Sequence, residues 1–372
     1  MNKFMIKPEI IFGEDSLNYL KDIKYNRFLI ITDKSMVQLK LVDKITEKLP
    51  KDSKIKIFSE VEPNPTVDVV EKGVKELFFF QPQCIIALGG GSSIDACKGI
   101  LYFGNKFFEN LGKSNKNIEF IAIPTTSGTG SEVTSYSVIT KGNSKIVLAY
   151  DEMLPKIALL NPGFMKTLPK KIIADTGIDV LTHGMEAYVS KNRNPFTNSM
   201  ALEAIKLVSK NLLEHFENPK DLIPRENIQY ASCLAGIAFN NSSLGINHSI
   251  AHSLGAKFHI SHGRSNGIVM PYIIDVNDQG EEFYVEIADV LGLPGRTPKE
   301  KRQALKIYVE ILKEKLEIPK SLKELGVDFE EFKKLLPEIL KDIKNDICTV
   351  YNPNSLNDEE YISLLLKIYF GE

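Results

Sequence analysis

The sequence lacks the features that mark a membrane-spanning, secreted or nucleic-acid-binding protein. No apolar run approaches the ~20 residues that cross a bilayer, and the charged N-terminal stretch has no hydrophobic signal-peptide core. A formal net charge of -2 over 372 residues gives no electrostatic basis for binding nucleic acid or an anionic membrane. The four cysteines form no CxxC pair, which argues against a disulfide framework or a thiolate metal site. We therefore expect a cytoplasmic enzyme with reduced thiols.

Two domains are expected, because 372 residues exceed what one hydrophobic core usually serves. In the first half, strand-like runs at residues 28–32, 54–58, 84–88 and 120–123 alternate with amphipathic segments such as 37–49 and 67–80. This alternation predicts a mainly parallel, Rossmann-like sheet covered on both faces. After about Leu168, apolar residues recur at helical spacing and strand-like runs nearly vanish. We predict an α/β dinucleotide-binding domain at 1–168, an all-α helical domain at 169–372, and an active site in the cleft between them.

Two polar loops follow two strands of the predicted sheet. The first, GGGSSID at residues 89–95, has the order strand, glycines and helix start that lets a phosphate approach backbone amides at the positive end of a helix. It does not match G-x-G-x-x-G, and by itself a tight turn explains it equally well. The second, PTTSGTGSEVT at residues 124–134, adds hydroxyl groups that can bind phosphate or ribose. Two such loops at strand ends favour a nucleotide site.

Asp33 ends another of the predicted strands. An acid at this position can accept hydrogen bonds from an adenosine ribose and repel a 2′-phosphate, which favours NAD over NADP. The alternative interpretation is that Asp33 caps the helix that follows it.

Histidines and one aspartate recur at helical spacing in the second half. Asp179 and His183 are four residues apart, as are His248 and His252, and His262 follows ten residues later. Residues four apart share a helix face, so two such helices can converge several ligands on one ion. Imidazoles with a carboxylate suit Fe²⁺ or Zn²⁺ rather than Mg²⁺ or Ca²⁺.

Ordinary core or capping histidines are the alternative interpretation of this segment. For a single histidine this alternative would be the better interpretation. For an aspartate–histidine pair together with three histidines in fifteen residues, it is the weaker one. His215 has no such neighbours and is expected on the surface. His259 is close enough in sequence to line the site but has no assigned role. Asn247 and the polar residues 240–243 precede the ligand segment and would make the approach to the site polar.

These motifs resemble those of the iron-dependent (group III) alcohol dehydrogenases. The resemblance runs from about residue 12 to residue 271 and includes EPNP at 62–65, GGGSSIDACK at 89–98, PTTSGTGSEVT at 124–134, TGIDVLTHGMEAYVS at 176–190 and the histidine segment at 248–263. Within the family, the sequence is most similar to the propanol dehydrogenase of propanediol-utilising microcompartments and to its ethanolamine-pathway relative, especially in the stretch IFSEVEPNPT.

The resemblance implies a dehydroquinate synthase-like architecture and assigns roles to individual positions. It implies metal ligands at Asp179, His183, His248 and His262, and a catalytic, non-ligand histidine at His252. Cofactor contacts are implied at Asp33, Asn64, Gly90, Gly91, Ser92, Asp95, Thr125, Thr126, Thr129 and Lys145. Phe239 matches an aromatic residue of the substrate pocket, and Tyr136 falls near another. Members of the family are usually dimers or larger assemblies, so a homo-oligomer is expected.

The predicted function is NAD(H)-linked interconversion of short primary alcohols and aldehydes, with hydride passing to or from nicotinamide and His252 carrying the proton. A diol dehydrogenase acting on 1,3-propanediol, 1,2-propanediol or lactaldehyde, or a glycerol dehydrogenase-like enzyme, is the alternative on the same fold. Dehydroquinate synthases share the plan but have a phosphate pocket rich in glutamate and lysine, which this sequence lacks. A non-catalytic NAD or metal sensor is the rival from another class. Association with a bacterial microcompartment is left open.

Overall fold

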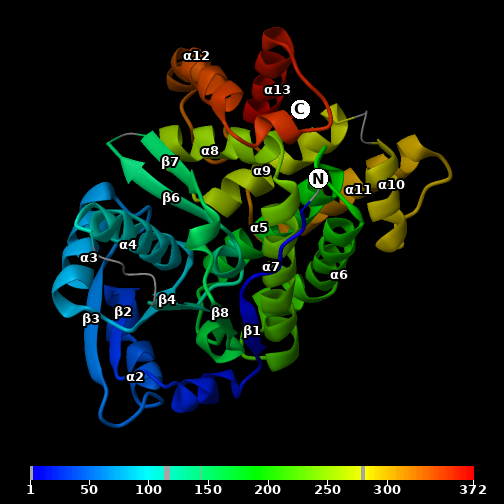
Figure 1. The fold of residues 1–372 in the computed structure, drawn as a ribbon. Helices are drawn as coiled ribbons and strands as arrows, with labels where there is room; N and C mark the ends of the chain where they lie inside the picture. Colours follow the sequence, from blue (N-terminus) through cyan, green and yellow to red (C-terminus); the bar gives the residue numbers. More distant parts are fainter. Residues whose placement is uncertain (1–2, 113–117, 143, 278–280) are drawn as a thin grey trace. The chain divides into compact units, whose positions relative to one another are not determined.

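The computed structural model describes residues 3–112, 118–142, 144–277 and 281–372, and the chain divides into two compact units (Figure 1). We call Met5–Thr167 the sheet unit. We call Leu168–Glu372 the helical unit, which also includes the start of the chain, where Phe4 stacks on Phe196 with ring centroids 5.1 Å apart.

The sheet unit contains a six-stranded sheet in which all the paired strands are parallel, as the alternating pattern predicts. The strand order is β1-β8-β5-β4-β2-β3. The strands are β1 (Glu9–Phe12), β2 (Arg27–Asp33), β3 (Lys54–Val61), β4 (Cys84–Gly89), β5 (Glu119–Pro124) and β8 (Ile157–Leu160). The α-helices of this unit are α1 (Lys34–Gln38), α2 (Leu41–Thr46), α3 (Val67–Phe80) and α4 (Gly91–Asn110).

The strand order changes direction beside β2. The chain leaves β2 for β3 on one side, then crosses back through α3 to β4 on the other side. Ligands of parallel α/β sheets bind at such a switch point, beyond the carboxyl ends of the strands. In this protein those ends carry Asp33 on β2 and Gly89 on β4, so the topology brings together two of the segments that the sequence marks for a nucleotide.

Separate apolar clusters cover the two faces of the sheet. One includes Leu77 of α3 and Ile100 of α4, and the other includes Ile45 of α2. Two details differ from the sequence pattern. The amphipathic segment at 37–49 is interrupted at Lys40, whose φ of 56° ends one short helix before α2 begins. An antiparallel hairpin of β6 (Tyr136–Lys141) and β7 (Ser144–Ala149) was not predicted.

The helical unit contains the α-helices predicted after residue 168. They are α5 (Lys170–Val189), α6 (Pro195–Glu217), α7 (Leu222–Ser242), α8 (Ile246–Phe258), α9 (His262–Val276), α10 (Glu281–Val290), α11 (Pro298–Lys315), α12 (Phe329–Asn345) and α13 (Asp358–Phe370). Nearly every residue of α5 from Ile173 onward is buried, because α6, α7 and α9 all pack against it. Among the helices of the described residues, none combines the length and apolarity needed to cross a membrane.

Candidate metal centre and nucleotide-binding edge

Helix α5 carries two of the candidate ligands on one buried face. Asp179 and His183 are 2% and 3% exposed, and both belong to the helical stretch that the TGIDVLTH motif predicts. Glu186, also buried, lies a further three residues along. Positions i, i+4 and i+7 of a helix share one face, so all three side chains project from the same side of α5.

Helix α9 starts in close contact with α5, and this contact positions His262. A Cβ added to Gly263 would lie 1.8 Å from the backbone oxygen of Asp175, so only glycine allows this approach. The carboxylate of Asp175 accepts hydrogen bonds from Ser261 Oγ at 2.6 Å and from Arg264 Nε at 2.9 Å. These residues flank His262, the first residue of α9. Asp175 therefore anchors the turn that presents the His262 ring.

The four candidate ligands lie together within the helical unit. One ligand atom from each of Asp179, His183, His248 and His262 lies within 4.8 Å of the others. The Oδ1 atom of Asp179 is 3.9 Å from His248 Nε2 and 3.6 Å from His262 Nε2. The His183 ring stacks on that of His248, with centroids 4.6 Å apart. Three imidazoles and a carboxylate that converge in this way form a donor set suited to Fe²⁺ or Zn²⁺.

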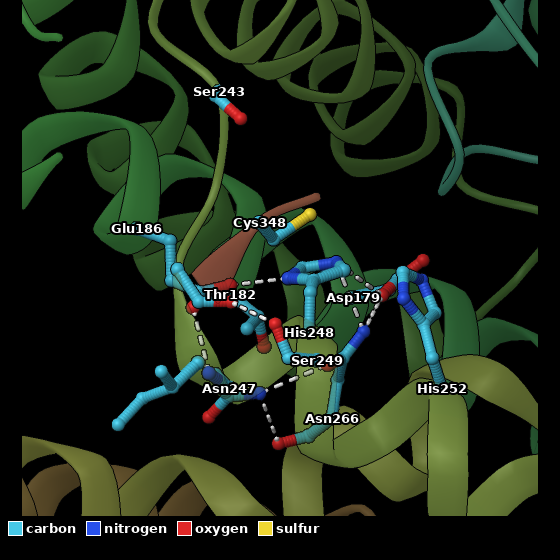
Figure 2. Close-up of polar contacts among 12 residues, drawn as sticks. Asp179, Thr182, Glu186, Ser243, Asn247, His248, Ser249, His252, Asn266 and Cys348 are labelled. Carbon is cyan, nitrogen blue, oxygen red and sulfur yellow. Dashed lines mark hydrogen bonds and ion pairs between the residues drawn. The ribbon is translucent and has the colours of Figure 1, made fainter. Parts of the chain in front are cut away.

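Glu186 orients His248, and the sequence analysis missed it. Its carboxylate is hydrogen-bonded to His248 Nδ1 and accepts the backbone N–H of Asn247 at 2.9 Å, at the start of α8. Because Nδ1 is used by Glu186, the Nε2 lone pair of His248 is left to face Asp179 (Figure 2). Carboxylates paired with the second nitrogen of a histidine are typical of metal sites. Burial raises the pKa of Glu186 to about 8, an effect that the hydrogen bonds from Asn247, His248 and Gly245 oppose.

Asp179 is a buried acid, and basic side chains do little to stabilise its negative charge. Burial raises its pKa to about 8, while a hydrogen bond from Asn266 lowers it, and Asp175 and Glu186 raise it further. A divalent cation would supply the positive charge that favours the ionised form. The residues present therefore fit a metal of the kind that the donor set indicates.

His252 lies beside the ligand group but has a different partner. Its ring stacks on that of His262 with centroids 5.2 Å apart, and its Nδ1 lies 2.7 Å from Asp346 Oδ2. Burial alone would raise the pKa of Asp346, but the hydrogen bond and charge of His252 hold that pKa below its usual range. An imidazole oriented by a carboxylate is the arrangement found in many proton-transferring sites. Asp346, just after α12, was not singled out in the sequence.

The remaining histidines and the predicted pocket aromatic lie in different settings. Phe239 on α7 is buried, and its ring stacks on His183 with centroids 4.5 Å apart. His259 is exposed and ends α8 with a φ of 55°. The prediction that His215 lies on the surface is wrong: it is 2% exposed, because α7 covers this side of α6. Burial lowers the pKa of His215 to about 4.

Asp33 caps a helix and also borders the glycine loop. Its Oδ1 accepts the N–H groups of Ser35 at 2.8 Å and Met36 at 3.2 Å, so it is the N-cap of α1, as the alternative interpretation proposed. The other carboxylate oxygen of Asp33, Oδ2, faces Gly89: a Cβ added to this glycine would lie 3.5 Å from it. The capping role leaves the carboxylate at the switch point of the sheet.

The two polar loops pack directly against each other. A Cβ added to Gly90 would lie 3.2 Å from Thr126 Oγ1, and one added to Gly91 would lie 2.7 Å from the methyl carbon of Thr129. The backbone N–H of Thr125 donates to the Gly89 carbonyl at 3.0 Å. From the EPNP motif, the N–H of Asn64 donates to Ser92 Oγ at 3.4 Å. These residues from three predicted motifs form one polar edge at the start of α4, which we call the nucleotide edge.

Asp95 and Lys145 are held within the sheet unit. Asp95 accepts hydrogen bonds from Ser131 Oγ at 2.6 Å and from the Val138 N–H at 3.1 Å. Burial lowers the pKa of Lys145, and the charge of Asp95 opposes this. Asp95 thus ties the second polar loop and the β6–β7 hairpin to α4, and Lys145 on β7 interacts electrostatically with Asp95.

No role was assigned from the sequence to Lys98, which lies in α4. It is fully buried, and its Nζ donates to Ser131 Oγ at 2.9 Å, Thr134 Oγ1 at 3.2 Å and the backbone oxygen of Tyr136 at 2.7 Å. Tyr136 is partly buried at the start of β6, within the sheet unit. Lys98 therefore anchors the second polar loop and the beginning of the hairpin.

The chain matches known proteins along nearly its whole length. The model of the Fe-containing alcohol dehydrogenase family, C-terminal, matches residues 173–369, and the iron-containing alcohol dehydrogenase model matches residues 7–162. The NADPH-dependent butanol dehydrogenase of Clostridium saccharobutylicum is 38% identical, over 100% of this chain and 99% of that protein. The 1-propanol dehydrogenase of Salmonella typhimurium is 35% identical, over 99% of this chain and 100% of that protein.

A solved structure has the same fold. The iron-containing alcohol dehydrogenase from Thermococcus thioreducens superposes with a TM-score of 0.89 at 33% identity, and the match covers 100% of both chains. Sequence, fold and the motif residues that cluster in each unit agree: the chain belongs to the iron-containing alcohol dehydrogenase family.

Proposed function

We propose that this enzyme interconverts short primary alcohols of about two to four carbons and their aldehydes, using NAD(H) and one divalent metal ion. The observation that carries the proposal is the convergence of Asp179, His183, His248 and His262, with the His252–Asp346 pair beside them. Ligands alone would serve a structural ion equally well. An oriented, partly exposed histidine next to them favours turnover.

The ion, which we take to be Fe²⁺ with Zn²⁺ as the alternative, would be held by Asp179, His183, His248 and His262. When bound, the ion supplies Lewis acidity, and the nicotinamide supplies the hydride chemistry. The chain itself contributes orientation. Glu186 fixes the tautomer of His248, Asp175 fixes the turn before His262, and packing against Phe239 restrains the ring of His183.

His252 would hold and move the proton that alcohol oxidation releases. Its side chain is 25% exposed, whereas that of His248 is 1% exposed, so of the two only His252 can exchange protons readily with solvent. Asp346 accepts from Nδ1 and so leaves Nε2 as the exchanging atom. We place Phe239 in the substrate pocket through its stacking on His183, and Tyr136 stays a prediction from the resemblance alone.

The nucleotide edge supports a dinucleotide cofactor. Its glycines let the Thr126 and Thr129 side chains pack against the start of α4, so that their hydroxyls lie beside the first turn of the helix. The backbone N–H groups of such a first turn favour a phosphate. One relative is named as NADPH-dependent, so the preference for NAD rests on the carboxylate of Asp33.

Removing the charge of Asp33 is expected to improve the use of NADPH. Asp33→Gly should raise the ratio of kcat/KM for NADPH to that for NADH at least about tenfold, because a carboxylate repels a 2′-phosphate. Glycine replaces an aspartate cap at a cost of only a few tenths of a kcal/mol, so folding should survive. Asp33→Asn is the matched variant, since it keeps the cap and removes only the charge. A wild type that already prefers NADPH, or an unchanged ratio in both variants, would show that Asp33 does not select the cofactor.

The substrate class is tested by a panel of aldehydes, glycerol and diols assayed anaerobically with NADH and NADPH, or with NAD and NADP for the alcohols. We expect the highest kcat/KM with propanal, butanal or acetaldehyde. Selection among neighbouring chain lengths should be modest, since one methylene is worth ~1–3 kcal/mol of discrimination. Preference for 1,3-propanediol, 1,2-propanediol or glycerol would favour the diol or glycerol alternative. Cofactor binding without turnover on any member would favour a sensor.

A further inference from the structure

Asn266 donates a hydrogen bond into the centre of the ligand group. It lies on α9 one turn after His262 and is fully buried. Its amide nitrogen, Nδ2, is 2.7 Å from Asp179 Oδ1 and 3.1 Å from His248 Nε2 (Figure 2). The same nitrogen is 3.2 Å from His262 Nε2. One amide therefore reaches a candidate ligand atom from each of the three helices α5, α8 and α9.

Asn247 holds this amide in its orientation. The Nδ2 of Asn247 donates to Asn266 Oδ1 at 2.9 Å and to the backbone oxygen of Asn266 at 3.2 Å. An oxygen that accepts from Asn247 leaves the nitrogen of the same amide to face the ligands. The backbone N–H of Asn247 donates in turn to Glu186. Asn247 was expected to make the approach to the site polar; instead it is 1% exposed and links α5, α8 and α9 behind the ligands.

Asn266 presents a hydrogen-bond donor to the same atoms that a cation would use. An N–H group can donate only to a ring nitrogen that carries a lone pair. Glu186 already takes the Nδ1 side of His248, so Nε2 is the bare nitrogen that Asn266 meets. The same amide donates to Asp179 Oδ1, a carboxylate oxygen that a cation could also bind. In the absence of an ion, the amide of Asn266 lies between acceptor atoms that would otherwise repel one another.

We propose that Asn266 is a positioning residue that assembles the ligand atoms of Asp179, His248 and His262 before a cation binds, with Asn247 as the residue that orients it. The inference rests on the proposed metal site. Preassembly lowers the reorganisation required when the ion enters, so losing it should weaken metal binding without removing any ligand. Outer-shell partners of metal ligands typically contribute 10–100-fold to affinity.

The test is metal affinity measured by chelator competition with Co²⁺ and Zn²⁺ on the full-length protein, together with the absorption spectrum of the Co²⁺ form. Asn266→Ala should bind both ions about 10–100-fold more weakly and shift the Co²⁺ bands, because the ligand geometry changes. Asn247→Ala should show a smaller loss in the same direction. The double variant should bind no more weakly than Asn266→Ala, since Asn247 acts through Asn266.

Asn211→Ala is the matched control. Asn211 is another buried asparagine of the helical unit, but its amide bonds Leu207 and Asn227 on α6 and α7. It should lower the Tm and leave metal affinity and the Co²⁺ spectrum unchanged. Wild-type affinity in Asn266→Ala would overturn the inference, and tighter binding would show that the amide competes with the ion. If Asn266→Ala does not fold, an unchanged affinity in Asn247→Ala overturns it equally. A wild type that binds no metal would instead refute the proposed function.

Discussion

His248→Ala is expected to remove bound metal and alcohol-dependent NADH formation together. His248 is the most deeply buried of the three candidate histidine ligands, and its Nε2 faces Asp179 and His262. Alanine would also deprive Glu186 of the ring it orients, leaving a buried carboxylate with one partner fewer. Changes to outer-shell partners already cost 10–100-fold in affinity, so losing a ligand should cost more than about 100-fold. The measurements are metal per chain after dialysis and kcat with propan-1-ol and NAD.

The matched control for this variant is His215→Ala. His215 is another buried histidine of the helical unit, and burial keeps its pKa at about 4, so at neutral pH the change removes an uncharged ring. We expect a lower Tm from the cavity, with metal content and kcat close to wild type. An active His248→Ala enzyme without metal would refute the ligand assignment.

His252→Ala is expected to keep its metal and lose most of its turnover. The ring contacts the ligand group by stacking on His262 and edge to face with His248, and its hydrogen bond goes to Asp346 rather than to a ligand. Metal content should therefore stay near wild type. Positioned acid–base groups contribute about 10²–10⁴-fold to rate, so kcat should fall within that range. Steady-state kinetics with elemental analysis on the same preparation separate the two effects.

Asp346→Asn provides a graded comparison. It should retain metal and lose less rate than His252→Ala, because the ring remains but its orientation is less well fixed. An unchanged kcat in His252→Ala would remove this residue from the proton path. Joint loss of metal and rate would make it a ligand instead.

Much of the fold was predictable because its signals are local. Runs such as residues 84–88 are apolar along their whole length, as a strand buried on both faces must be. Helix α5 follows from apolar spacing, and Asp179 and His183 fall on one face of it by that same spacing. The nucleotide edge was predictable because parallel strands end at one side of the sheet, which brings loops far apart in sequence together.

The supporting residues of the site were harder to find. Glu186 and Asn266 lie at helical spacing from Asp179 and His262, so a search for polar residues on the ligand faces would have found both. Asp346 carried no such signal, since it lies 94 residues from His252 and is positioned by the packing of α12 on α8. His215 was misplaced because one histidine in a charged segment looks solvent-exposed until α7 is seen to cover it. Long-range packing, rather than local pattern, decides such positions.

The central claim is that one metal ion at Asp179, His183, His248 and His262 is required for alcohol and aldehyde turnover. The most direct test is to strip the purified enzyme with a chelator under anaerobic conditions and return Fe²⁺ or Zn²⁺ in measured portions. NADH oxidation with propanal should be absent from the stripped enzyme, rise with added metal and level off at one equivalent per chain. The same titration of His248→Ala should stay flat. Full activity in the metal-free wild type would contradict the claim.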